Sequence, residues 1–183
     1  MDFWTQLARY SFYETQRLTL RPPSFADAGD FFEIASDKEN LHFVFPTVIS
    51  QEESDYLLTH AFLEKPLGIW VISETGSDKM IGIIRFENIN VSNLSVDIGY
   101  FLHADFRSRG YMSEAVKNVS SIAFQELGLR ELRIITHLEN IASQQVALNT
   151  GFTLKKRFKG SDRYSRQTRD YLLYQLSKGD YHE

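Results

Sequence analysis

The chain has 183 residues, no cysteine and a formal net charge of −4, and its length suits one domain. The absence of cysteine excludes disulfides, thiolate metal sites and covalent cysteine catalysis. The acidic balance disfavours a nucleic-acid partner and mildly favours a cationic one, such as an amine or a basic protein.

No apolar run approaches the roughly 20 residues that a membrane span needs, and the opening residues lack the basic and apolar regions of a signal peptide. We therefore expect a cytoplasmic protein without a membrane partner. Because the sequence has no repeat and no linker-like tract, we expect residues 1–183 to form one domain. Residues 1–14 are then an N-terminal extension that packs on it.

Apolar residues at helical spacing predict a short helix around Phe3–Leu7, which lies across the core or forms a dimer contact. Residues 17–21 alternate polar and apolar side chains, as a half-buried strand does, and two prolines end that strand. Capping-box patterns at Ser24–Asp27 and Ser50–Glu53 predict two helices after it.

The middle of the chain predicts three strands, at residues 69–72, 81–86 and 96–102. The segments between them, around residues 76–78 and 88–93, are short and polar, as turns are. Because short connections join antiparallel neighbours, these strands are expected to form a meander.

The last third predicts a long helix at residues 112–127, a strand at 132–136, a short helix at 141–149, and strands near 153–158 and 171–176. A strand-helix-strand crossover of this length implies parallel pairing. The expected order is β-α-α-β-β-β-α-β-α-β-β, which makes a mixed α/β sheet.

The stretch between the meander and the long helix has the features of an anion site. The first turn of a helix leaves backbone N–H groups unpaired and carries the positive end of the dipole. Gly110 lets the loop curl around one centre, Arg107 and Arg109 add charge, and Ser113 adds a donor. The sequence lacks the lysine of a P-loop and the glycines of a dinucleotide fold. The alternative is a helix that begins after a glycine turn with two solvated arginines.

The sequence resembles the GNAT acetyltransferases, in particular their RimJ/RimL-like branch. Arg107-x-x-Gly110-x-Met112 is similar to the family signature that holds the coenzyme A pyrophosphate. The other segments that match, in chain order, are residues 15–21, 97–102, 140–146, 151–152 and 169–174. The likeness extends from about Glu14 to Ser177.

The resemblance implies a GNAT fold, in which a central strand pair splays apart, and acetyl-CoA as the cosubstrate. The pantetheine arm would fill the gap and pair with main chain, as an added strand does. The coenzyme-binding residues implied in this way are Phe101, Leu102, Arg107, Ser108, Arg109, Gly110, Tyr111, Met112, Ser113, Asn140 and Ser143.

Three positions depart from the family pattern. Met112 stands where the family usually has Gly or Ala, and Asp97 replaces the more usual Glu. Ala147 occupies the position where many members have a tyrosine acid, so the common proton donor is missing.

An amine attacks a thioester only when it is neutral, so a base or a water relay is useful. Glu87 and Asp97 are the candidate bases, although either is also compatible with an ion pair or a solvated acid. Ser143 is the candidate group for the departing thiolate, and main-chain N–H groups near Phe101 and Leu102 would hold the oxyanion. No metal site is expected.

Two histidines and a basic run complete the candidates. His137 follows a buried strand and suits a structural role, and the simplest interpretation of His103 is solvent exposure. The late loop, including Tyr164, Arg166 and Asp170, is where family members often shape the acceptor pocket. The basic residues of this region are a substrate or phosphate contact or, more commonly, a solvated face; they are Arg157, Lys159, Arg163, Arg166 and Arg169.

The sequence therefore predicts an N-acetyltransferase that moves acetyl from acetyl-CoA to a primary amine, on a protein N-terminus or a small molecule, by direct transfer in a ternary complex. The first alternative is a noncatalytic acyl-CoA-binding sensor or scaffold, which the loss of tyrosine at Ala147 favours. The second is a nucleotide-phosphate binder or another interaction protein. Monomer and homodimer are both compatible with the sequence.

Overall fold

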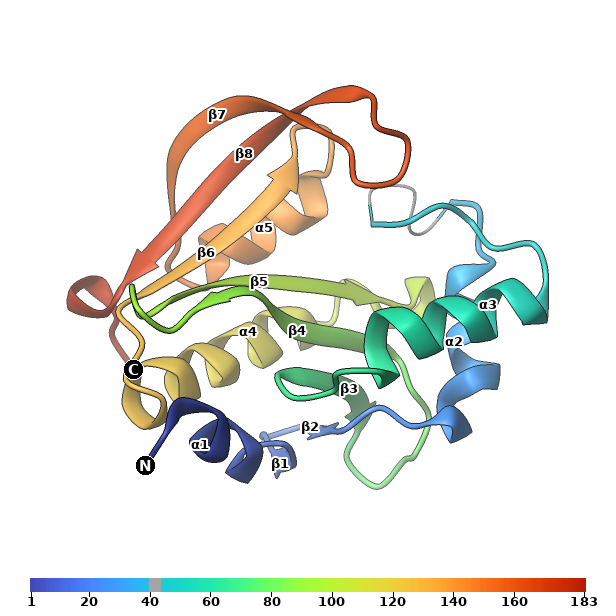
Figure 1. The fold of residues 1–183 in the computed structure, drawn as a ribbon, viewed down its shortest axis with the longest axis horizontal. Helices are drawn as coiled ribbons and strands as arrows, with labels where there is room; N and C mark the ends of the chain where they lie inside the picture. Colours follow the sequence, from blue (N-terminus) through green and yellow to red (C-terminus); the bar gives the residue numbers. More distant parts are fainter. Residues whose placement is uncertain (40–43) are drawn as a thin grey trace. The chain divides into compact units, whose positions relative to one another are not determined.

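The computed structural model describes residues 1–39 and 44–183 (Figure 1). The chain divides into two compact units. The first unit consists of Met1–Arg85 and Tyr100–Ala115, and the second of Phe86–Gly99 and Val116–Glu183. Strands β4 (Gly82–Asn90) and β5 (Ser95–Leu102) and helix α4 (Tyr111–Ser121) contribute residues to both units.

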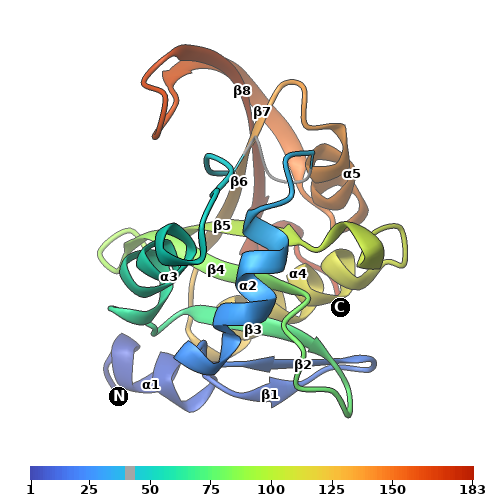
Figure 2. The same cartoon turned by 90° about the vertical axis from the view of Figure 1, so that its right-hand side faces the viewer.

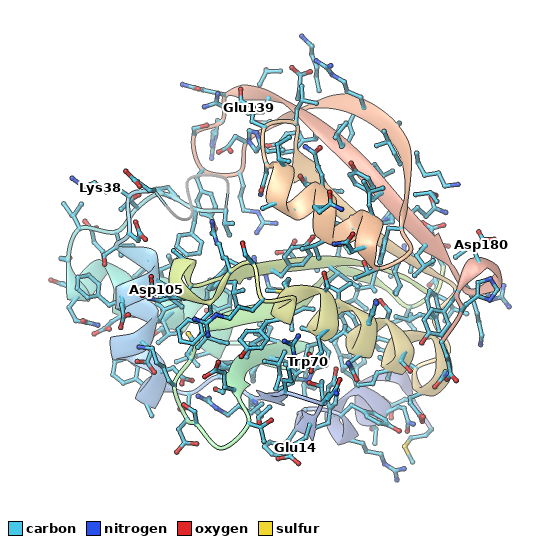
Figure 3. All side chains as sticks on the ribbon, turned by 180° about the vertical axis from the view of Figure 1, so that it is seen from behind. Glu14, Lys38, Trp70, Asp105, Glu139 and Asp180 are labelled. Carbon is cyan, nitrogen blue, oxygen red and sulfur yellow. The ribbon has the colours of Figure 1, made fainter. Side chains whose placement is uncertain are left out.

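The first unit begins with the expected N-terminal helix, α1 (Phe3–Arg9), which Asp2 caps. Leu7 is buried on this helix. Just beyond it, the indole N–H of Trp70 donates to the Tyr10 carbonyl at 2.8 Å, and Trp70 is labelled in Figure 3. The N-terminal helix predicted from the spacing of apolar residues is therefore confirmed.

The strands of the first unit form an antiparallel sheet. β1 (Tyr13–Glu14) pairs with β2 (Leu18–Arg21), β2 with β3 (Ile69–Glu74), and β3 with the first half of β4. On β2 the burial alternates along the strand, as the sequence pattern predicts.

The two predicted helices cover this sheet with an apolar layer. The capping box at Ser24 opens a 3-10 turn, Phe25–Asp27, before α2 (Ala28–Ala35) begins. Ser50 caps α3 (Gln51–Leu58), and a π-helical turn, Thr59–Leu63, follows it. Figure 2 shows α2 and α3 beside each other. Their core cluster with the strands includes Phe31, Ile34, Leu58, Phe62, Val71, Ile83 and Phe101.

In the second unit, β5 pairs in parallel with β6 (Glu131–His137), as the crossover length predicts. The pairing runs from Ser95 with Glu131 to Asp97 with Arg133, whereas β6 pairs with β8 (Thr168–Ser177) along its whole length. β8 also pairs with β7 (Thr153–Ser161). A three-residue register is the short parallel contact expected of a strand pair that diverges.

The helices of the second unit end where glycine permits a left-handed backbone. α4 continues into a π-helical turn, Ile122–Glu126, and Gly128 follows with φ +68°. α5 (Ile141–Asn149) has its predicted bounds, and Gly151 after it has φ +91°. A 3-10 turn, Lys178–Asp180, follows β8.

One predicted turn is displaced. Residues 88–93 were expected to form a polar turn, but β4 continues to Asn90 and the turn lies at residues 91–94. Asn88 is accommodated with φ +49°, and its side-chain amide donates to Asp97 at 2.8 Å. This cross-strand partner stabilises a strand end that the composition alone describes as a loop.

The strand order of the eight-stranded sheet is β1-β2-β3-β4-β5-β6-β8-β7. The antiparallel pairs β3–β4 and β6–β8, the parallel pair β5–β6 and the helices between strands confirm the mixed α/β class predicted from the sequence. None of the described helices is long and apolar enough to cross a membrane.

Candidate active site

The predicted site residues fall into both units. Phe101, Leu102 and residues 107–113 belong to the first unit, and the candidate catalytic residues and Asn140 belong to the second. The candidate residues of each unit are therefore described through the contacts within that unit.

A buried histidine shapes the chain as it leaves β5. His103 precedes a 3-10 turn, Ala104–Phe106, and is 8% exposed. Its Nδ1 accepts the backbone N–H of Asp105 at 3.0 Å, and its Nε2 lies 2.7 Å from a Glu33 carboxylate oxygen. Because Nδ1 accepts, the ring proton belongs on Nε2. Exposure was therefore the wrong expectation for His103.

Glu33 is held in turn by a lysine. The pKa of Glu33 is lowered, first by the hydrogen bond from Lys79 and then by that from His103. The Lys79 ammonium lies 3.0 Å from Glu33. This chain of contacts fixes the start of the turn, whose exposed Asp105 side chain is labelled in Figure 3.

The loop before α4 has the backbone of an anion-binding turn. Ser108 and Gly110 have φ +61° and +79°, the left-handed conformation found where successive N–H groups converge. A side chain at Gly110 would be strained by this φ, and its Cβ would lie 3.4 Å from the Arg17 guanidinium. The glycine predicted to shape the loop does so.

Two side chains of the first unit brace the loop. The Arg17 guanidinium donates to the Arg109 carbonyl at 2.9 Å and pairs with Glu114 at 2.7 Å. Glu114 also accepts the Arg17 backbone N–H and the Thr15 hydroxyl. Burial alone would raise the pKa of Glu114, but these hydrogen bonds lower it. Sequence reasoning missed this brace, because its partners lie almost a hundred residues apart.

Arg109 and Tyr111 are held by the same strand residue. The Tyr111 hydroxyl donates to Glu74 at 2.6 Å, and Arg109 lies 3.6 Å from the same carboxylate oxygen. Arg109 also donates to the Asp105 carbonyl and stacks on the Phe106 ring. The hydrogen bond to Glu74 raises the pKa of Tyr111. Arg109 therefore supports the loop through these contacts and also contributes positive charge to it.

Arg107 lies against the end of β5, where its Nε donates to the Leu102 carbonyl at 3.3 Å. Desolvation lowers the pKa of the Arg107 guanidinium, the direction that a nearby anion would reverse. Phe101 and Leu102 are buried. A Cβ at Gly82 would meet the Phe101 carbonyl at 2.4 Å, so β4 and β5 approach here as only glycine allows.

Met112 departs from the family pattern without occupying the loop surface, because it is 6% exposed and packs inward. Ser113, one residue along the helix, is partly buried. The large side chain at position 112 is thus part of the core.

In the second unit, Glu87 lies over a glycine. A Cβ at Gly99 would meet the three carboxylate atoms of Glu87 at 3.1 to 3.3 Å. The Glu87 side chain is 25% exposed and lies 3.8 Å from the Arg163 guanidinium. The glycine of β5 therefore makes room for this carboxylate.

Asp97 is engaged by two neighbours. The Arg133 Nε donates to one carboxylate oxygen at 2.7 Å, and Asn88 donates to the other at 2.8 Å. Asp97 is 5% exposed. The sequence is compatible with an ion pair or a solvated acid at Asp97, and the structure shows the ion pair.

The start of α5 brings Asn140 and Ser143 together. The Asn140 side chain accepts the Ser143 N–H at 3.2 Å and so caps the helix. Gln144 donates to the carbonyls of His137 and Leu138 and so ties the helix to the end of β6. Ala147 is completely buried, so a tyrosine there would require repacking.

His137 belongs to an aromatic group at the end of β6. Its ring lies 4.9 Å from that of Tyr171, which stacks on Phe158 at 5.6 Å. Its Nε2 lies 3.9 Å from Asp162. Within the described residues, no three His, Asp or Glu side chains are grouped so that they could hold a metal ion.

The loop between the end of β5 and the start of α4 thus combines left-handed backbone at Ser108 and Gly110 with a helix N-terminus, a combination that suits an anionic group. The family model described as an acetyltransferase (GNAT) domain matches residues 17–153, about three quarters of the chain. The chain therefore belongs to the GNAT acetyltransferase family, whose members are acetyl-CoA-dependent enzymes.

Individual relatives agree with the family. The chain is 27% identical over 143 residues to the N-acetyltransferase YoaA of Bacillus subtilis, covering 76% of this chain and 81% of the relative. It is 32% identical over 97 residues to a ribosomal-protein-serine acetyltransferase of Escherichia coli, covering 53% and 54%. The second match supports the RimJ/RimL-like branch.

Solved structures share the fold. A GNAT-family acetyltransferase from Bacillus anthracis has a TM-score of 0.81 at 20% identity, covering 92% of this chain and 99% of that one. RimL, a ribosomal alpha-N-protein acetyltransferase in complex with coenzyme A, has a TM-score of 0.75 at 23% identity, covering 89% and 95%. The predicted GNAT fold is confirmed.

Proposed function

We propose that this protein transfers acetyl from acetyl-CoA to a primary amine on a protein N-terminus. The observation that carries the proposal is the loop at the start of α4, where Ser108 and Gly110 adopt left-handed backbone and Arg107 supplies charge. These features fit a diphosphate, because N–H groups and a helix N-terminus stabilise it together.

We assign the coenzyme contacts residue by residue. Residues 107–113 bind the pyrophosphate through backbone N–H groups, the Arg107 charge and the Ser113 hydroxyl. The main chain of Phe101 and Leu102 pairs with the pantetheine arm. In the second unit, Asn140 and Ser143 at the start of α5 contact the pantetheine and its sulfur. Acetyl-CoA supplies the activated acetyl group; no metal takes part in the proposal.

The chemistry proposed is direct attack of the neutral amine on the thioester. Glu87 accepts the amine proton, directly or through water. The N–H groups near Phe101 and Leu102 hold the oxyanion of the tetrahedral intermediate. The Ser143 hydroxyl donates a hydrogen bond to the departing thiolate, which is all that a weak acid contributes.

Glu87 is preferred to Asp97 as the base because its carboxylate is the more accessible. Glu87 is 25% exposed, and Arg163 lies 3.8 Å away, so a water or an amine has room to approach. Asp97 is 5% exposed and already accepts hydrogen bonds from Arg133 and Asn88, so its carboxylate leaves little room for an amine or a water. We infer that Asp97 positions β5 and β6.

Two relatives support the proposed class of acceptor. Ribosomal-protein-serine acetyltransferase of Escherichia coli and RimL are named for action on ribosomal proteins, and we extend a protein α-amine to this chain as its acceptor class. A cytoplasmic location, a single domain, and a monomeric or homodimeric state stay predictions.

An assay of thiol release separates this function from a noncatalytic acyl-CoA module. The protein is mixed with acetyl-CoA and a panel of peptides with free or blocked N-termini, and free coenzyme A thiol is measured over time. We expect thiol release only with free α-amines and about a tenfold lower kcat in Ser143→Ala, the loss of roughly one hydrogen bond. Tight acetyl-CoA binding without turnover on any amine supports the sensor or scaffold instead.

A further inference from the structure

Basic side chains gather in the last hairpin of the second unit. We call residues 155–169 the basic hairpin; it runs from β7 through the connecting loop to the start of β8. Its cations, all exposed, are Lys155, Lys156, Arg157, Lys159, Arg163, Arg166 and Arg169. It holds 7 of the chain's 20 Lys and Arg, but only Asp162 of the 24 Asp and Glu.

The net charge of the whole chain conceals this separation. The basic hairpin carries +6, and the remaining 13 basic and 23 acidic residues carry −10. Charges are screened over about 8 Å at physiological salt, so a partner at the hairpin meets the local charge. The cationic partner that the total of −4 mildly favours is therefore not the partner that this surface favours.

Protection of a sheet edge explains only part of the charge. β7 is the last strand in the order, and among the described residues its strand partner is β8 alone; lysines on an exposed edge discourage pairing with another chain. That explanation covers the cations of β7. Arg163 and Arg166 lie in the loop, and Arg169 lies on β8 opposite Gly160, where no open edge needs protection.

Hydrogen bonds hold the loop that presents these arginines. The Asp162 carboxylate accepts the N–H groups of Tyr164 and Ser165 at 3.0 and 2.8 Å, and the Ser165 bond is the main reason that the pKa of Asp162 is lowered. The Arg166 N–H donates to the Asp162 carbonyl at 2.9 Å. The cations are thus displayed on an ordered turn, which reduces the entropy lost on binding.

Internal ion pairs use few of the cations. Within the part of the chain that the structure describes, Arg157 lies 3.5 Å from Asp170 and Arg163 lies 3.8 Å from Glu87; the other five have no ion pair. The Arg163 contact links the basic hairpin to the carboxylate proposed as the base. Arg163 therefore places one end of the basic hairpin beside that carboxylate.

We propose that the basic hairpin recognises the acceptor, and that the acceptor is a polypeptide with acidic side chains just after its N-terminal residue. This inference rests on the proposed function. From Lys155 to Lys159, β7 extends about 13 Å at 3.3 Å per residue. One small carboxylate cannot span this length, so the strand suits a ligand that carries several carboxylates. The rest of the chain has a surplus of acidic residues, which repels a long polyanion such as RNA. A short acidic segment contacts the basic hairpin alone and is not repelled in this way.

The test compares three peptides that share one N-terminal residue and differ only in the next three residues. These residues are Asp or Glu in the acidic peptide, Asn or Gln in the amide peptide, and Lys or Arg in the basic peptide. We expect the wild-type kcat/KM to be at least about tenfold higher for the acidic peptide than for the amide peptide. Raising salt from about 50 to about 300 mM should reduce that ratio, because exposed charges are screened. The amide peptide reports whether acetyl transfer itself occurs.

Charge reversal supplies the matched comparison. Lys155→Glu with Arg169→Glu should remove most of the acidic preference while turnover of the amide peptide is kept. Lys117→Glu with Lys178→Glu changes the total charge equally at exposed positions of the same unit and should leave the preference intact. The inference is overturned by equal kcat/KM for acidic and amide peptides, by equal effects of the two double variants, or by an RNA oligonucleotide that binds the hairpin more tightly than the acidic peptide. Turnover of no peptide at all would reject the proposed function instead.

Discussion

Glu87 and Asp97 are both acids of the β4–β5 region, but different groups already hold them. Asp97 accepts two hydrogen bonds at 2.7 and 2.8 Å from Arg133 and Asn88. Glu87 rests over Gly99 with a looser contact to Arg163 at 3.8 Å. The contrast separates a carboxylate that stabilises the fold from the one proposed as the base.

Exchange of each carboxylate for its amide tests this division. Glu87→Gln should lower kcat by about 10²-fold or more, the usual contribution of a general base, with little change in the free energy of unfolding. Asp97→Asn should instead lower the free energy of unfolding by about 1.5–3 kcal/mol, because a charged hydrogen bond is lost. Pre-steady-state kinetics and urea unfolding report the two quantities. The reverse pattern would transfer the catalytic role to Asp97.

The contact between Glu114 and Arg17 that supports the loop before α4 should depend on pH. The Glu114 side chain is 12% exposed, and the hydrogen bonds of Thr15 and Arg17 outweigh burial to lower its pKa from 4.5. A lowered pKa in the folded state contributes stability above the unfolded value and loses it as the pH falls through the folded value.

We therefore expect the stability gap between wild type and Glu114→Gln to be full at pH 7 and to shrink below about pH 4.5. Urea unfolding at several pH values measures it. Glu126→Gln, at an exposed position, is the control and should show a smaller gap throughout. A gap for Glu114→Gln that does not change with pH would exclude the ionic brace.

These residue-level contacts mark the limit of what the sequence alone predicts. Gly110 and Asn140 act through local backbone, so their roles follow from neighbours in the sequence. His103 meets Glu33 across seventy residues, and Arg17 meets Glu114 across ninety-seven. No local pattern encodes such partners, so burial of His103 and the brace of the loop were not predicted.

At the scale of elements, hydrophobic periodicity predicted most boundaries well. α5 agrees with the expected range at both ends because its cap and its glycine stop are local signals. β4 runs past its predicted end because Asn88 gains Asp97 as a partner. The two-residue β1 and the π-helical turns after α3 and α4 have no distinct sequence pattern.

The cap of α5 allows structural and coenzyme roles to be separated. Asn140→Ala should lower the free energy of unfolding by about 1 kcal/mol, because the Ser143 N–H loses its acceptor. Asn140→Asp keeps the cap and should restore stability. If Asn140 also contacts the coenzyme, both variants raise the KM for acetyl-CoA; an unchanged KM in Asn140→Asp would restrict the residue to capping.

At the scale of the whole molecule, charge is distributed unevenly. The total of −4 combines a hairpin of +6 with a remainder of −10. The total of −4 disfavours a nucleic-acid partner and mildly favours a cationic one, but it does not reveal that the positive charge is concentrated in one hairpin. The order of strands and helices, by contrast, was available from the sequence because each element carries its own periodicity.

Binding of coenzyme A to Gly110→Ala tests whether the loop before α4 holds a diphosphate. Gly128→Ala is the matched control, since that glycine also has a positive φ, +68° against +79°, and each alanine costs about 1–2 kcal/mol in this backbone region. Calorimetry should show coenzyme A binding weakened at least about tenfold in Gly110→Ala alone, a loss of about 1.4 kcal/mol, with pantetheine, which lacks the pyrophosphate, bound equally by all three proteins. Equal affinity of all three for coenzyme A would contradict a diphosphate held by the loop at Gly110.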